Sequence, residues 1–309
     1  MIDFHRPLFS EKEAYQALLA ADRPRGCEYS FNNIYMWGQR QLAFDRGFAL
    51  TLSRFDDFIT YSLPVGTGDR KAAVERLLED AGERGIPFRL SGLNNEDRQE
   101  LEALFPGKFR FQPDRDSFDY VYDINALAEL PGRKLQKKRN HVNRFYAVHP
   151  DWYVQEIRED MMPMLREMAG EWYAQREAYR PEGMYNMEKA AISRAFDHYR
   201  DMDMEGLVLK EEEQLLAFTI GSRLREDMFD THFEKAVEYS DGTYAMINRE
   251  FAVYMREKYP ELRYINREDD MGLEGLRQAK CAYNPHHLIE KQIAYLPEEG
   301  LPGEEGYGN

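Results

Sequence analysis

The last hundred residues run through strand-like and helix-like segments in an order that strongly constrains the fold. Three β-like runs, GLVLK, QLLAFTIGSR and MFDTHFEKA, occupy residues 206–236 and are separated by short turns, which predicts three antiparallel strands. Apolar periodicity then predicts a helix over 243–258, a strand over 262–265, a helix over 273–281 and a closing strand over 287–295. A mixed, mostly antiparallel sheet flanked by helices accommodates this order.

The first 130 residues repeat this order of elements, although no repetition of residue identity is visible. The runs QLAFD, FALTLSR and FITYSLPVG predict an antiparallel meander. A helix over 69–83, a strand over 86–90, a helix over 95–104 and a strand over 118–124 follow. The repeated order indicates two copies of one α/β (α+β) architecture.

Length and composition are compatible with two domains. A chain of 309 residues with 43% hydrophobic side chains can form two cores of ordinary size. The Pro131-Gly132 pair marks a boundary, so we predict an N-terminal domain over 1–130 and a C-terminal domain over 131–296. Residues 297–309 are rich in Gly, Pro and Glu and are expected to form a flexible tail.

Charge and cysteine content exclude several classes of protein. The chain has 41 Lys plus Arg against 56 Asp plus Glu, a net charge of -15, so a nucleic-acid partner requires a local basic patch. Cys27 and Cys281 lie far apart without a C-x-x-C context, which argues against a zinc site or a disulfide framework. No signal-peptide pattern is visible, and no apolar run reaches the roughly 18 residues of a membrane span. We therefore expect a cytoplasmic protein without a metal.

One basic patch stands out against the acidic background. The stretch GRKLQKKRNHVNRF carries six Lys or Arg and no acid over residues 133–144. Lys134, Lys137, Lys138 and His141 fall at helical spacing, as a face that contacts phosphates would. A solvated helix that links two domains has the same pattern. A patch of this size suits a tRNA acceptor end or a phosphorylated cofactor, with Lys137, Lys138 and Arg139 as candidate ligands.

The strand MFDTHFEKA carries candidates for acid–base chemistry. A period of two places Asp230, His232 and Glu234 on one face, which predicts either a half-exposed strand or a charged site. In the second case His232 or Glu234 deprotonates an attacking amine.

The turn that follows is a candidate anion site. Ser240, Gly242 and Thr243 surround the start of the predicted helix, where free N–H groups bind a phosphate or an oxyanion. Asp241 is the competing natural N-cap. Asn248, on the same helix, is expected to face the strand ends and to bind substrate.

The stretch YINREDDMGLEGLRQAKCAYNP, residues 264–285, has the highest density of polar groups. Asp270 either caps the next helix or, with Asp269, holds a cationic amine. Arg277 and Lys280 lie on one helical face and either pair with Glu274 or bind an anion. Tyr283 either donates a proton to a leaving group or belongs to the core. The candidate catalytic residues are thus His232, Glu234, Asp270 and Tyr283. The candidate substrate-binding residues are Asn248, Asn266, Asp269, Arg277 and Lys280.

These residues also carry a resemblance to known proteins. The C-terminal half resembles an acyltransferase domain of the GNAT superfamily. Most of the chain beyond about residue 115 resembles the uncharacterised DUF2156-type family related to the C-terminal domain of phosphatidylglycerol lysyltransferases. The resemblance is carried by Gly132-Arg-Lys, Lys138-Arg139-Asn140, His232-Phe-Glu-Lys-Ala236, Asp241-Gly242-Thr-Tyr244, Ile247-Asn248, Asn266 to Gly272, Gly275-Leu-Arg277, Lys280, Tyr283 and Pro285.

The resemblance implies two GNAT-like domains, as in the Fem-type transferases that use aminoacyl-tRNA. It implies an acyl or aminoacyl transferase acting on an amine-bearing small molecule or peptide, with aminoacyl-tRNA or acyl-CoA as donor. The usual pyrophosphate loop of GNAT enzymes is altered, because EYSDGTYA has one glycine, Gly242, and a bulky Tyr244. An acetyl-CoA-dependent N-acetyltransferase and a noncatalytic ligand-binding module remain the alternatives.

Overall fold

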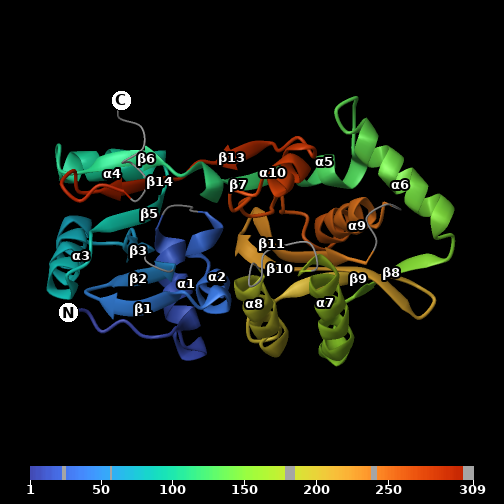
Figure 1. Ribbon diagram of the computed structural model, residues 1–309, viewed down its shortest axis with the longest axis horizontal. Coiled ribbons are helices and arrows are strands. Elements are labelled where there is room, and N and C mark those ends of the chain that lie inside the picture. The colour runs from blue at the N-terminus through green and yellow to red at the C-terminus, as the bar shows by residue number, and fades with distance from the viewer. Residues whose placement is uncertain (23–25, 56–57, 178–184, 238–241, 302–309) are drawn as a thin grey trace. The chain divides into compact units, whose positions relative to one another are not determined.

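The computed structural model describes residues 1–22, 26–55, 58–177, 185–237 and 242–301 (Figure 1). The chain forms two compact units. Unit 1 combines Met1–Phe118 with Ile289–Asn309, and unit 2 is the continuous segment Asp119–Leu288. In the part of the chain that is described, no helix combines the length and the apolarity needed to cross a membrane.

Unit 1 is built on a mixed sheet with the strand order β1-β2-β3-β5-β14-β6, and β4 pairs with β2. Its helices form where the sequence supplies caps and an apolar face. In α3 (Arg70–Arg84), Asp69 accepts a hydrogen bond from the Ala72 N–H, Val74 and Leu77 are buried, and Gly85 ends the helix with φ +67°. The strands are β1 (Arg40–Asp45), β2 (Phe48–Phe55), β3 (Phe58–Ser62), β4 (Val65–Gly66), β5 (Arg89–Leu93), β6 (Arg110–Pro113) and β14 (Gln292–Tyr295), and the other helices are α1 (Lys12–Ala21), α2 (Phe31–Trp37) and α4 (Asn95–Leu104).

Unit 2 is built on a second mixed sheet with the order β13-β7-β12-β11-β10-β9-β8. Figure 1 shows α9 on one face of this sheet and α7 and α8 on the other. On the α9 face, Phe229 packs edge-on against Phe251 with ring centres 5.5 Å apart. The strands are β7 (Asp119–Asp123), β8 (Trp152–Glu156), β9 (Glu205–Glu211), β10 (Gln214–Arg225), β11 (Met228–Ala236), β12 (Tyr264–Asn266) and β13 (His287–Ile289), and the helices are α5 (Ile124–Glu129), α6 (Gln136–Val148), α7 (Met162–Glu177), α8 (Asn186–Asp197), α9 (Thr243–Lys258) and α10 (Glu274–Cys281).

The predicted architecture of two mixed, mostly antiparallel sheets flanked by helices is confirmed. The assignment of strands to sheets differs from the predicted division at residue 130. The strand predicted over 118–124 is β7 and pairs with β12 in unit 2, with Tyr122 opposite Ile265. The closing strand predicted over 287–295 is two strands, β13 in the sheet of unit 2 and β14 between β5 and β6 in unit 1. Pairing partners far apart in the chain decide this, and apolar periodicity does not encode them.

Candidate functional site

Strands β11 and β12 lie side by side for a short distance and then diverge. They pair in parallel from Met228 opposite Tyr264 to Asp230 opposite Asn266, whereas β11 continues to Ala236. The chain after Asn266 leaves the sheet at Arg267. Where two parallel neighbours separate, side chains from both can fill the space between them. We call the polar side chains on the α9 side of this point the divergence site: Thr219, Thr231, Glu234, Asn248 and Arg267.

A β-bulge in β11 decides which side chains face this site. Ile220 lies opposite Phe233, but its neighbour Gly221 lies opposite Thr231, so His232 is an extra residue. A Cβ atom at Gly221 would lie 2.0 Å from the Asp230 carbonyl oxygen, which is why glycine is needed here.

The bulge reverses the alternation of faces along β11. Residues directly opposite each other in an antiparallel pair share a face. Glu234, opposite Thr219, therefore lies on one face, and Asp230, opposite Ser222, lies on the other. The prediction that Asp230, His232 and Glu234 share a face is wrong, because a strict period of two cannot include an inserted residue.

A buried ion pair lies at the centre of the divergence site. The Glu234 carboxylate lies 2.9 Å from an Arg267 guanidinium nitrogen, and the Asn248 amide nitrogen donates to its other oxygen at 3.3 Å. Burial alone would lower the pKa of Arg267, but the charge of Glu234 and nearby tyrosines outweigh it, and the pKa is raised. Arg267 is therefore a cation near neutral pH, and it also lies over the ring of Tyr283 at 5.1 Å.

The same site contains buried polar atoms whose hydrogen-bonding capacity is unused. Within the described residues, the side-chain oxygens of Thr219, Thr231 and Asn248 have no hydrogen-bond partner, although these residues are 0%, 7% and 4% exposed. Each such atom costs about 1–3 kcal/mol of folding free energy. Folding alone does not explain this cost, which makes the site a candidate for binding a polar group.

Helix α6 brings one lysine of the basic patch to this site. The Lys138 ammonium lies 3.8 Å from the centre of the Tyr283 ring. Burial, reinforced by the charge of Arg267 and opposed by that of Glu234, lowers the pKa of Lys138 to about 8. Burial also raises the pKa of the Tyr283 hydroxyl. Lys138 is thus a group that titrates close to physiological pH.

The start of α9 packs closely against α6. Gly242 has φ +96°, and a Cβ atom there would lie 2.0 Å from the His141 carbonyl oxygen. Thr243 is buried at the first position of the helix, and Ser240 lies outside the described residues. Lys137 is exposed. Arg139 instead donates to the carbonyl oxygens of Leu130 and Gly132, so it holds the preceding turn.

The polar stretch after β12 is largely occupied with its own structure. The buried Asp270 accepts from the Tyr120 hydroxyl at 2.6 Å and from two Arg277 nitrogens at 2.9 and 2.8 Å. Burial opposes ionisation of Asp270, but Arg277 and Tyr120 prevail and hold its pKa at about 2. Arg277 therefore pairs with Asp270, which was not the partner predicted for it, and the predicted capping of α10 by the Asp270 side chain is wrong, because Leu273 is the N-cap residue.

The remaining predicted residues of this stretch also hold the turn. The Asn266 amide donates to Asp119 at 2.9 Å, and its oxygen accepts from the Glu268 N–H at 2.8 Å. Asp269 accepts from the Met271 N–H at 3.2 Å. The Lys280 ammonium donates to the carbonyl oxygens of Arg267 and Asp269. The stretch therefore positions Arg267 but contributes no other side chain to the divergence site as we define it.

His232 lies apart from Glu234. It is buried and hydrogen-bonds Ser222 at 2.8 Å and Glu268 at 2.9 Å. Sequence reasoning missed Ser222, Thr219, Thr231 and Arg267. Only Arg267 carried a sequence signal, since an arginine directly after a buried strand requires a counter-ion.

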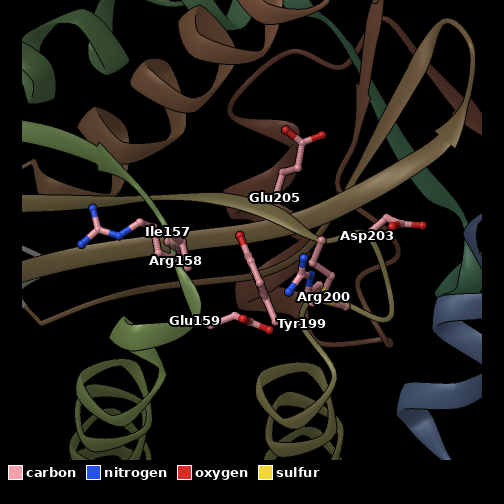
Figure 2. A pocket seen from close by; sticks show the side chains of 8 residues that line it. Ile157, Arg158, Glu159, Tyr199, Arg200, Asp203 and Glu205 are labelled. Atoms are coloured by element: carbon pink, nitrogen blue, oxygen red, sulfur yellow. The ribbon is translucent and has the colours of Figure 1, made fainter.

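A surface pocket of about 370 Å³ lies elsewhere in unit 2, between the ends of β8 and α8. Figure 2 shows Arg158, Glu159, Arg200 and Asp203 around Tyr199 in its wall. It includes none of the predicted site residues. Its mixed surface charges do not converge on one chemical group, so the divergence site remains the candidate.

Comparison with known proteins adds the family. The model of the family described as "Phosphatidylglycerol lysyltransferase, C-terminal" matches residues 21–295. The chain belongs to this family. The predicted resemblance is thereby confirmed. A conserved protein of unknown function from Bacteroides thetaiotaomicron is 35% identical, with a TM-score of 0.88 over 96% of this chain and 100% of that chain.

More distant proteins share the fold. L-PGS from Bacillus licheniformis is 15% identical with a TM-score of 0.66, over 94% of this chain and 93% of that chain. FemX is 12% identical with a TM-score of 0.58, over 96% and 98%. An uncharacterised protein of Mycoplasmoides gallisepticum is 24% identical over 183 residues, 57% of this chain and 56% of that protein, so the match spans about half of that relative. The family supports a transferase at a coarse level, and the distant solved structures show the fold.

Proposed function

We propose that unit 2 is an acyl or aminoacyl transferase that binds an amine at the divergence site. The observation that carries the proposal is the buried group of acceptors there. The Glu234 carboxylate and the unused Asn248 oxygen lie on adjoining side chains, and the Thr231 hydroxyl shares their face. An amine donates hydrogen bonds and suits such acceptors. The amine belongs to the acceptor of the transfer, a small molecule or a peptide.

The chemistry needs a proton acceptor as well as a binding site. The amine nitrogen forms a bond to the carbonyl carbon of an ester or thioester, and the bond from that carbon to the leaving oxygen or sulfur breaks. The amine loses a proton and the leaving group gains one. Lys138, with a pKa of about 8, is suited to take the proton, whereas Glu234 remains paired with Arg267 and orients the amine. Glu234 is in this proposal a positioning residue.

The basic face of α6 supports aminoacyl-tRNA as the donor. Lys137, His141 and Arg144 are exposed on this helix, next to the half-buried Lys138. In a chain with a net charge of -15, such a patch suits the phosphates of a tRNA acceptor end. The resemblance to Fem-type transferases supports the same donor. Acetyl-CoA is the alternative donor.

The test uses both donors in parallel. The protein is incubated with a pool of aminoacyl-tRNAs labelled in the amino acid, or with labelled acetyl-CoA, together with a panel of amines and small peptides. Transfer of label from tRNA to an amine, lost in Asn248→Ala but kept in the exposed control Asn143→Ala, is the expected result. Transfer from acetyl-CoA alone would assign the alternative donor. Binding of an amine without turnover of either donor would overturn the proposal in favour of a ligand-binding module.

A further inference from the structure

The opposite face of the sheet carries a second array of groups with a definite geometry. The Ser222 hydroxyl lies 2.8 Å from His232 Nε2, and His232 Nδ1 lies 2.9 Å from a Glu268 carboxylate oxygen. The two imidazole nitrogens thus join a hydroxyl on β10 to a carboxylate after β12. A nucleophile, base and orienting acid are recognised by this geometry and not by their order in the chain.

Two irregular backbone positions create the array. His232 is the inserted residue of the β11 bulge, and a regular strand would aim its side chain elsewhere. Glu268 has φ +55°, a left-handed conformation that side chains with a Cβ atom rarely adopt. Two hydrogen bonds hold Glu268 in place. The Asn266 side-chain oxygen accepts from the Glu268 N–H, and the Tyr120 N–H donates to the Glu268 carbonyl oxygen. Strain of this kind persists where the surroundings fix it, and it is enriched at functional sites.

Two carboxylates lie near the His232 imidazole. Glu268 faces it from the turn after β12, and the Asp230 carboxylate lies 3.8 Å from the same Nδ1 atom. Hydrogen bonding to Glu268 assigns the proton of the neutral imidazole to Nδ1, which leaves Nε2 to accept the proton of Ser222. The Glu268 carboxylate also holds the imidazole in the orientation that this transfer needs.

We propose that Ser222, His232 and Glu268 form a second catalytic centre, in which Ser222 is a nucleophile toward small esters. The Ser222 oxygen bonds to the ester carbonyl carbon while its proton moves to His232 Nε2. The bond to the leaving oxygen then breaks, and that oxygen takes the proton from His232. The product is an acyl-Ser222 intermediate and a free alcohol, and water releases the acyl group by the reverse sequence.

The nucleophile and its base are both buried. Ser222 and His232 are 3% and 8% exposed. The centre is therefore tested with small, uncharged probes. The centre is separate from the divergence site, because Ser222 and Glu234 lie on opposite faces of the sheet.

The experiment treats the full chain with diisopropyl fluorophosphate, a small probe that phosphorylates activated serines, and locates the adduct by peptide mass spectrometry. The expected result is one adduct on Ser222, lost in Ser222→Ala and kept in Ser193→Ala. His232→Gln should slow labelling at least 100-fold, and Glu268→Gln at least tenfold. Thermal unfolding of each variant separates loss of chemistry from loss of fold.

Release of p-nitrophenol from p-nitrophenyl acetate provides a second readout, with an initial burst if the acyl intermediate accumulates. Absence of an adduct on the wild-type chain, or an adduct on any other residue, would overturn the proposal whatever the variants do. Neither readout contains tRNA, coenzyme A or an amine, so failure here and failure of the proposed transferase activity are distinguishable.

Discussion

Two polar clusters of unit 2 use their hydrogen-bonding groups in opposite ways. In the turn after β12, Asp270 accepts from Tyr120, Arg277 and the Gly272 N–H, and Lys280 donates to two carbonyl oxygens. In the divergence site, Asn248 and Thr231 keep buried oxygens that bind nothing among the described residues. The number of polar residues in a stretch is therefore a poor guide to function. Buried polar atoms that folding leaves without a hydrogen-bond partner are a better guide to function.

Breaking the ion pair of the turn should have the largest effect on stability. Asp270→Asn leaves Arg277 without its bidentate partner, and we expect a loss of about 3–5 kcal/mol in the free energy of unfolding. Urea unfolding measures it, with the exposed Glu274→Gln as control. A loss below about 1 kcal/mol would mean that the turn is not held by this pair.

The contribution of Asp270 has a defined pH range. Its pKa is lowered to about 2 in the folded protein, so the stabilisation is present above the unfolded value of about 4. It decreases as the pH falls through that value and is lost below about 2. Wild type and Asp270→Asn should therefore become equally stable near pH 2, as urea unfolding at several pH values can test.

A change at the ion pair of the divergence site should act first on activity. Glu234→Gln keeps the shape of the side chain but removes the charge that orients the amine, and we expect kcat/KM for transfer to fall about 100-fold. Glu213→Gln, in an exposed turn, is the matched control. If both variants transfer at the wild-type rate, the acceptor amine does not bind at Glu234.

Lys138 predicts the pH dependence of transfer. A base with a pKa of about 8 is mostly protonated at pH 7 and mostly neutral at pH 9, so the rate should rise about tenfold between these values. Lys138→Arg, which stays charged, should lose both the rise and most of the activity. A flat profile in the wild type would instead assign Lys138 to phosphate binding.

Thr231→Val should have the smallest effect, but it tests most directly whether buried polar groups left without a partner serve binding. Thr231→Val replaces an unpartnered buried hydroxyl with a methyl group of similar size, and we expect the protein to gain about 1 kcal/mol in stability while transfer becomes weaker. In unit 1, the buried Thr51 hydroxyl likewise has no hydrogen-bond partner among the described residues. Thr51→Val should give the same gain in thermal unfolding without affecting transfer.

Local sequence patterns predicted most elements but not their long-range relations. Periodicity identified α9, α10 and the strands β9 to β11, because each repeat is encoded within its own segment. The extra residue His232 was not predictable, since it is set by the register against Gly221 on another strand. For the same reason, only the register between β10 and β11 showed which face of the sheet Glu234 lies on, and which clusters Thr219 and Ser222 belong to. For Asp270, neither the capping nor the amine-binding interpretation included Arg277 as its partner, which only the three-dimensional contacts revealed.

The position of β14 has a consequence for how the protein is made. This strand lies between β5 and β6, yet it is made after every other strand that the structure describes. At synthesis rates of about 5–20 residues per second, the segment from residue 119 to residue 295 takes on the order of 10–35 s. During that time β5 and β6 lack their common neighbour, whereas all described strands of unit 2, including β13, precede β14 in the chain. Unit 2 can thus fold before unit 1 is complete, and the open sheet edge of unit 1 needs protection until β14 has been made.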